Sequence, residues 1–123
     1  MNLHHGSLEN LIMNVVWMHS DDYQGLMSVN QVWEKLNLLN TNKKWAYTTV
    51  KTVLDRLADK GMLDRIKSGK KFNYSTIMPR NEMAEKALKK LALDYFSNDF
   101  LAMAKFVQEM AYQEEKNSVN VYK

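Results

Sequence analysis

The sequence predicts a mainly α-helical chain with one small β-hairpin, and three observations lead to this fold class. Apolar residues recur at helical spacing in three segments between residues 7 and 61. A run of strand-favouring residues interrupted by Ser-Gly follows. Two further amphipathic segments come after Pro79, the single proline. Three helices and then a hairpin is the order of a winged helix-turn-helix domain, in which the hairpin is the wing.

The first two helices are predicted from their apolar stripes and their starts. Segment 7–19 begins at Ser7, the expected N-cap, and segment 28–37 begins with Ser28 and Gln31 in the S-x-x-Q form of a capping box. Residues 21–26 between them read as a loop. The stripes consist of Leu8, Leu11, Ile12, Val15 and Val16 in the first helix and of Val29, Val32, Trp33 and Leu36 in the second.

The third helix is predicted over residues 46–60 of WAYTTVKTVLDRLADKG, with Gly61 as its C-terminal cap. At 100° per residue, its two faces separate completely. The apolar face includes Val50, Val53, Leu54 and Leu57, and Tyr47 lies near enough to it to be assigned to the core. The polar face is acid-free in its N-terminal half, and Asp55 and Asp59 lie in its C-terminal half.

The wing is predicted over residues 66–73, within MLDRIKSGKKFNYSTI. Ile66, Phe72 and Tyr74 favour strands, and Ser68-Gly69 supplies a turn in which glycine adopts a positive φ. Lysines flank this turn at positions 67, 70 and 71.

The C-terminal part is predicted as a helical region, residues 80–112, followed by a polar tail, residues 113–123, that we expect to fray. Ser97 or Asn98 is expected to cap its second helix. Two helices of this length are too small to bury a core of their own, so their stripes need either the winged domain or a second chain. The residues concerned are Leu88, Leu91, Tyr95, Phe100, Leu101, Ala104, Val107 and Met110.

Charge is unevenly distributed along the 123 residues. Residues 43–71 carry nine basic and three acidic side chains, whereas residues 1–42 have a net charge of −3 and residues 72–123 are balanced. A local basic excess of this kind is typical of proteins that bind a polyanion. It coincides with the third helix and the wing.

Several classes of protein are disfavoured by what the sequence does not contain. It has no cysteine, which excludes disulfides and thiolate metal sites, and it has no membrane-spanning run or secretory signal pattern. A cytoplasmic protein is therefore expected. His4, His5 and His19 lack further ligands at suitable spacing, so we expect no metal and no cofactor. No enzyme motif is recognised, so no catalytic residue is assigned.

These patterns predict a DNA-binding surface with two kinds of contact. The N-terminus of a recognition helix meets base edges, and its dipole favours phosphate. We therefore expect base or near-base contacts from Thr48, Thr49, Lys51 and Thr52. We expect backbone contacts from Lys43, Lys44, Arg56, Lys70 and Lys71. The alternatives are a merely solvated helix face and a winged-helix protein-interaction module without specific DNA binding.

Residues 6–78 also resemble a known family. HGSLENLIMNVVW, VWEKLN, WAYTTVKTVLDRLADKGMLDR and SGKKFNYS are similar, in this order and spacing, to the BlaI/MecI/CopY (penicillinase repressor) family. The AYTTVKTVLDRLADKG segment is the most specific part. The resemblance implies a cytoplasmic transcriptional repressor that binds a palindromic DNA operator as a homodimer. It also implies that residues 80–112 hold the dimer interface, formed by the apolar stripe residues given above.

Two branches of that family make different predictions about induction. The copper-responsive branch ends in a cysteine motif, which this chain lacks. In the β-lactam-responsive branch a protease cuts an Asn-Phe bond, and the nearest counterpart here is Lys105-Phe106. The inducing signal, an unidentified protease or effector, therefore stays open.

Overall fold

The computed structural model describes the chain in two compact units, Met1–Arg80 and Asn81–Lys123. It describes the backbone of residues 3–39 and 43–121 and the side chains of residues 8–39 and 43–118. In this described part, no helix has the length and apolar character needed to cross a membrane.

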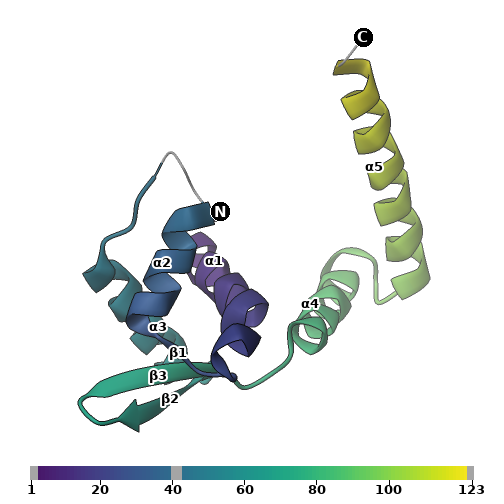
Figure 1. Cartoon of the computed structure of the whole chain (residues 1–123). Helices are drawn as coiled ribbons and strands as arrows, with labels where there is room; N and C mark the ends of the chain where they lie inside the picture. Colours follow the sequence, from purple (N-terminus) through teal and green to yellow (C-terminus); the bar gives the residue numbers. More distant parts are fainter. Residues whose placement is uncertain (1–2, 40–42, 122–123) are drawn as a thin grey trace. The chain divides into compact units, whose positions relative to one another are not determined.

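The N-terminal unit contains three helices and a small sheet, which confirms the predicted fold class (Figure 1). The sheet has three antiparallel strands in the order β1-β3-β2, so the wing hairpin gains a third strand that the sequence did not predict. Met27 pairs with Tyr74, and Ser28 with Asn73. The elements are α1 (Leu3–His19), the short 3-10 helix η1 (Ser20–Tyr23), β1 (Met27–Ser28), α2 (Val29–Leu39), α3 (Tyr47–Asp59), β2 (Leu63–Ser68) and β3 (Lys71–Thr76).

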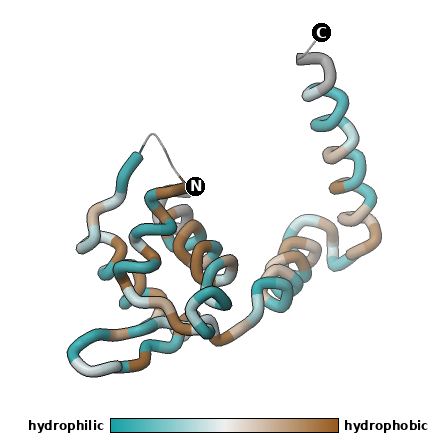
Figure 2. Tube along the Cα trace, in the orientation of Figure 1, coloured by the Kyte–Doolittle hydropathy of each residue, from teal (hydrophilic) through white to brown (hydrophobic). Residues whose placement is uncertain are grey.

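One core joins all three helices to the sheet. The apolar side of α3 supplies Val50, Val53, Leu54 and Leu57, all buried as predicted. They pack with buried residues of α1 and α2 and with the fully buried ring of Tyr74 on β3. Hydrophobic residues recur along these helices, whereas the turn of the hairpin is coloured from white to teal (Figure 2). Burial of this side turns the polar side of α3 outward, and that side carries the candidate site.

The ends of α2 and α3 follow the predicted capping chemistry. The backbone N–H of Gln31 donates to Ser28 Oγ (3.2 Å), and the N–H of Ser28 donates to Gln31 Oε1 (2.9 Å). After α3, Gly61 has φ +78° and its N–H donates to the Ala58 carbonyl, while the Met62 N–H reaches the Leu57 carbonyl. The prediction for α1 was wrong, because α1 begins at Leu3 and Ser7 lies inside it.

The C-terminal unit consists of α4 (Arg80–Tyr95) and α5 (Phe100–Val121). Ser97 and Asn98 have positive φ and form the turn between them, so neither is the predicted cap. Asp99 takes that role, since its Oδ1 accepts the Ala102 N–H at 3.0 Å. The helix continues to Val121, so part of the segment from residue 113 that we expect to fray is helical.

Candidate nucleic-acid interface

The N-terminal half of α3 presents an exposed, acid-free surface. Thr48, Lys51 and Thr52 are exposed and Thr49 is half-buried. Thr52 Oγ1 donates to the Thr48 carbonyl at 2.9 Å, which leaves its oxygen lone pairs for an incoming donor. Within the described part, the hydroxyls of Thr48 and Thr49 have no partner and are available as donors and acceptors. The three threonines, with Leu8, Val53 and Arg56, line an open hollow of about 330 Å³.

Asp55 is where the polar side of α3 meets the hairpin. Its carboxylate accepts hydrogen bonds from Lys51 Nζ on α3 (2.8 Å), from Arg65 Nη1 on β2 (3.1 Å) and from the Tyr74 hydroxyl on β3 (2.5 Å). Partial burial acts to raise the pKa of Asp55, but these hydrogen bonds outweigh it and hold the pKa below the usual value. The pKa of Tyr74 is raised by burial and by the bond to Asp55. Asp55 is therefore ionised at neutral pH.

The pairing with Asp55 changes the interpretation of Lys51. Its side chain is half-exposed, but its ammonium already has a carboxylate partner. A base contact by Lys51 must therefore exchange or share that ion pair. The pair has i,i+4 spacing and was visible in the sequence, whereas the contributions of Arg65 and Tyr74 depend on long-range folding and were missed.

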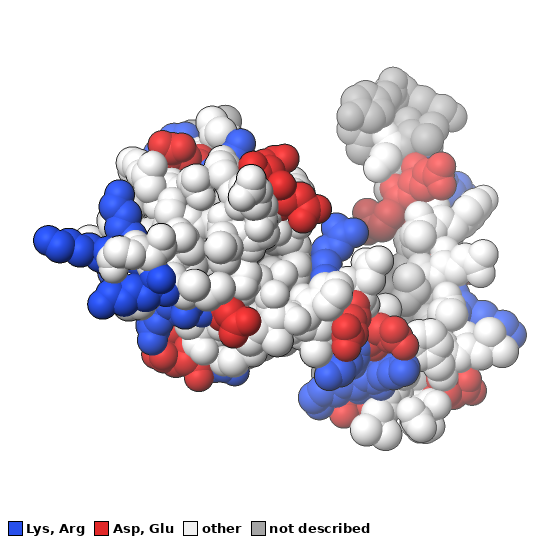
Figure 3. Space-filling model, turned by 60° about the horizontal axis from the view of Figure 1, so that its bottom comes forward, with Lys and Arg blue, Asp and Glu red and all other residues white. Residues whose placement is uncertain are grey.

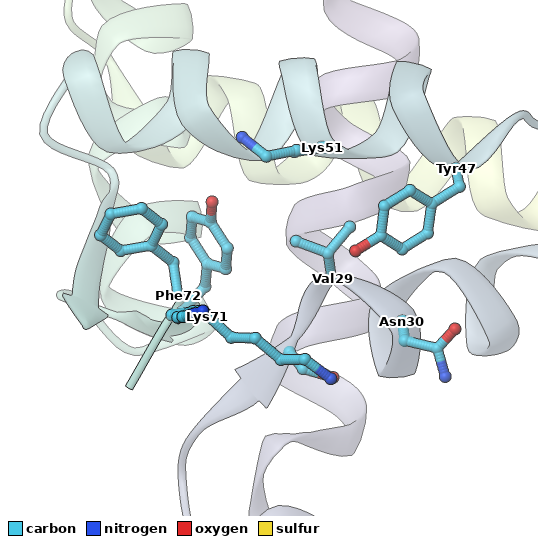
Figure 4. Close-up of a pocket in the computed structure, with 9 residues that line it drawn as sticks. Val29, Asn30, Tyr47, Lys51, Lys71 and Phe72 are labelled. Carbon is cyan, nitrogen blue, oxygen red and sulfur yellow. The ribbon is translucent and has the colours of Figure 1, made fainter. Parts of the chain in front are cut away.

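The wing carries free cations next to an aromatic hollow. In the part of the chain that the structure describes, Lys70 and Lys71 have no hydrogen-bond or ion-pair partner. They flank Gly69, whose φ of +64° is suited to the hairpin turn. Between the wing, α3 and the start of α2 lies a hollow of about 200 Å³ (Figure 4). Its lining residues are Ser28, Val29, Asn30, Tyr47, Lys51, Lys70, Lys71, Phe72 and Tyr74.

The segment before α3 is held by the end of α2. The Trp45 N–H donates to Asn37 Oδ1 (2.7 Å), and the Trp45 carbonyl accepts from Asn37 Nδ2 (3.1 Å) and from the Trp33 indole (2.8 Å). Lys44 Nζ donates to the Asn37 carbonyl at 2.8 Å, and Lys43 Nζ lies 4.2 Å from the Trp45 ring centroid. Both lysines therefore sit at the entry to α3, and Lys44 already has a backbone acceptor.

Tyr47 differs from its prediction. It was assigned to the core, but 43% of the residue is exposed. Its ring meets the edge of Trp33 at a centroid distance of 6.0 Å, and it borders the wing hollow. Tyr47 is the first residue of α3, one turn before the buried Val50.

Arg56 lies near an acidic side chain and is also partly exposed to solvent. Arg56 Nη1 lies 3.8 Å from Glu9 on α1, and Lys60 Nζ lies 3.0 Å from the same carboxylate. Arg56 is still half-exposed, so this pair is weak and can share its guanidinium with a phosphate.

The basic side chains gather at the hairpin end of this unit. In Figure 3 Lys and Arg side chains project on that side, and acidic side chains lie beside and below them. The fold thus brings the lysines at 43–44, the polar start of α3 and the wing lysines onto one unit. Arg56 lies at the α1 border, and Lys51 is tied to Asp55.

In the C-terminal unit, all the predicted stripe residues are exposed. Tyr95, for example, is 76% exposed. Ala92 and Met103 are buried, and the Phe96 and Phe106 rings pack at 5.5 Å. Three more exposed apolar residues, Leu93, Phe106 and Tyr112, were not in the predicted set. Phe106 belongs to the Lys105-Phe106 bond noted above.

The histidines can be placed only in part. The side chains of His4 and His5 lie outside the described residues. His19 Nδ1 is 3.6 Å from Asp22 Oδ2. Among the side chains that the structure describes, no three His, Cys, Asp or Glu residues are grouped in a way that would hold a metal.

Comparison with known proteins identifies the family. The methicillin resistance regulatory protein MecI of Staphylococcus aureus (strain N315) is 27% identical over 89 residues, covering 72% of this chain and 66% of that protein. The transcriptional regulator BlaI of Mycobacterium tuberculosis (strain CDC 1551 / Oshkosh) is 33% identical over 78 residues, covering 63% and 51% respectively. A solution structure of the DNA-binding domain of the repressor BlaI shares 30% identity at a TM-score of 0.47, covering 60% of this chain and 80% of that one.

The matches extend over about half to two thirds of the length of these curated relatives. The model of the penicillinase repressor family matches residues 5–119, which include both units of the structure. The chain belongs to the penicillinase repressor family.

Proposed function

We propose that this chain is a sequence-specific DNA-binding transcriptional repressor that binds a palindromic operator as a homodimer. In this proposal α3 enters the major groove and the wing lies on the sugar-phosphate backbone. The observation that carries the proposal is the acid-free, exposed start of α3 together with wing lysines that have no hydrogen-bond or ion-pair partner among the described residues.

The start of α3 has the chemistry that groove reading needs. The hydroxyls of Thr48 and Thr49 can donate to or accept from base edges or phosphates, and a threonine methyl can contact the thymine methyl. Thr52 is restricted to accepting, because its hydroxyl proton is used within the helix. Lys51 can reach guanine acceptors if it exchanges its bond to Asp55.

The proposed backbone contacts differ in how freely they are available. Among the described residues Lys70 and Lys71 have no internal bond that must be broken, so we rank them first. Lys44 must exchange the Asn37 carbonyl for a phosphate, and Arg56 must share its charge with Glu9. Lys43 approaches from the Trp45 ring at the entry to α3. The free wing lysines should therefore contribute most to the salt dependence of binding.

The exposed apolar surface of α4 and α5 supports the homodimer. Large apolar patches on a protein surface favour association, and two-fold association is the commonest kind. Leu88, Leu91, Tyr95, Phe100, Leu101, Ala104, Val107 and Met110 are the proposed contacts. A two-fold dimer presents two copies of α3, which fits a palindromic operator with half-sites about one helical turn, or a multiple of it, apart.

The relatives favour the same function. MecI and BlaI are named as regulators, and the solved BlaI domain is named as the DNA-binding domain of a repressor. The competing candidate, a winged-helix protein-interaction module, would need neither a basic excess at the wing nor unpaired lysines there.

Selection from a random-sequence duplex library followed by anisotropy titration tests the proposal. We expect an enriched sequence with two-fold symmetry, two chains per duplex, and a log affinity that falls linearly with log salt. Absent binding, or binding that ignores both sequence and salt, would favour the protein-interaction module.

A further inference from the structure

Asp55 connects three elements of the candidate interface. Its carboxylate holds Lys51 from its own helix, Arg65 from β2 and Tyr74 from β3. The Tyr74 ring is fully buried, so its hydroxyl links Asp55 directly to the core. The Arg65 guanidinium also lies over the Phe72 ring, 5.3 Å from its centroid, inside the same hairpin.

Strand β2 buries little apolar surface of its own, although β3 is anchored in the core through Tyr74. Along β2 only Leu63 is buried, and every residue from Asp64 to Ser68 is exposed. An edge strand with one buried side chain is positioned weakly by packing, since buried apolar area is what resists its displacement. The hydrogen bonds and ion pairs to Asp55 therefore contribute much of what fixes the orientation of β2 relative to α3.

Resting on the proposed function, we propose that Asp55 is a positioning residue that fixes the wing to the recognition helix and thereby sets sequence discrimination. If the wing is held at one angle to α3, Lys70 and Lys71 can contact the DNA phosphates only when the α3 threonines are aligned with their bases. A wing free to swing would bind backbone phosphates without that register, and discrimination between sequences would fall.

Electrostatics alone predicts a different outcome: an unchanged ratio of specific to nonspecific affinity. Asp55 is a negative charge on a face proposed to meet phosphates, so its removal should strengthen binding to every duplex. Positioning predicts that the ratio of specific to nonspecific affinity falls. Asp59→Asn is the matched control, because Asp59 lies on the same helix, is 72% exposed and approaches Arg65 only to 3.9 Å.

The first arm of the experiment needs no DNA. Amide hydrogen exchange in β2 and β3 is measured by NMR for the unaltered chain, Asp55→Asn and Asp59→Asn. We expect exchange in β2 to accelerate about tenfold in Asp55→Asn, a change equivalent to about 1.4 kcal/mol, and to stay unchanged in Asp59→Asn. Equal amide protection of β2 in all three proteins would show that Asp55 does not hold the wing against α3.

The second arm measures affinity for the library-selected duplex and for a scrambled duplex of the same composition. Asp55→Asn should lower the affinity ratio about tenfold, whereas Asp59→Asn should raise both affinities and leave the ratio unchanged. Tyr74→Phe keeps the buried ring and removes only the hydroxyl, so it should lower the ratio even if Asp55→Asn fails to fold.

Arg65→Gln separates a tether from a direct DNA contact. If Arg65 acts through Asp55, the double variant Asp55→Asn/Arg65→Gln should lose no more discrimination than the worse single variant. Additive losses, or an Asp55→Asn protein that behaves like Asp59→Asn, would overturn the positioning role. Failure of the unaltered chain to bind any duplex would instead refute the proposed function, while the exchange arm alone would still decide the tether.

Discussion

The two units of the chain differ in how much apolar surface they bury. The N-terminal unit encloses a continuous core that extends from Ile12 on α1 to Tyr74 on β3. The C-terminal unit, in its described side chains, buries Ala92 and Met103 and leaves leucine, phenylalanine, tyrosine and methionine side chains exposed. A unit with its own core can fold alone, whereas a unit that exposes its stripes depends on a partner. The N-terminal unit is therefore the candidate DNA-binding domain, and the C-terminal unit is the candidate dimerisation region.

A core deletion should give the largest effect. Leu54→Ala removes a fully buried side chain from α3 and should destabilise the N-terminal unit by about 2–5 kcal/mol. All three tryptophans, Trp17, Trp33 and Trp45, lie in this unit, so fluorescence-monitored urea unfolding reports on it directly. Leu91→Ala is the control, and a comparable loss there would erase the difference between the units.

A charge on the exposed stripe should have the next largest effect. Leu91→Glu places a carboxylate where the proposed partner chain packs, so the dimer dissociation constant should rise at least about tenfold. Sedimentation equilibrium measures the constant, and Lys86→Glu is the exposed control on the same helix. An unaltered chain that is already monomeric at high concentration would contradict the proposed interface.

The two kinds of DNA contact should separate on substitution. Lys51→Ala should cost about 1–3 kcal/mol on the selected duplex and relax the preference at one position of each half-site. Lys70→Ala should weaken binding to all sequences about equally and reduce the salt slope by about one. Affinity titrations over a set of operators with single-base changes distinguish these patterns. Identical profiles for the Lys51→Ala and Lys70→Ala proteins would contradict the assignment of base and backbone contacts.

The smallest effect concerns pH. The pKa of Asp55 is lower in the folded chain than in the unfolded one, so its contribution to stability is present above the unfolded value of about 4 and is lost as pH falls below it. Between pH 5 and pH 3, Asp55→Asn should therefore lose less stability than the unaltered chain. Urea midpoints across this range measure the effect, and parallel curves would show that Asp55 gains nothing from its partners on folding.

Local rules were enough to predict much of this fold. Helical spacing assigned the buried side of α3, the Ser28–Gln31 box assigned the start of α2, and Gly61 assigned the end of α3. Each of these depends on residues close together in sequence. The lysines of the wing were also found locally, because they flank a glycine turn.

The sequence could not predict features that depend on distant residues. Strand β1 has only two residues, too few to show a periodicity, and it exists because β3 pairs with it. The network around Asp55 joins residues on three separate elements. Lys51 was predicted as a base or near-base contact. Its i,i+4 neighbour Asp55 was visible in the sequence, but the hydrogen bonds that Arg65 and Tyr74 donate to the same carboxylate were not.

We propose that the start of α3 and the wing together form the DNA-binding surface. The most direct measurement is a titration of the isotope-labelled full chain with the selected duplex, followed by amide chemical shifts. We predict that the largest changes map to residues 47–52 and 68–71, and that η1 is little affected. Changes centred on η1 and α1, with the start of α3 unmoved, would contradict the claim.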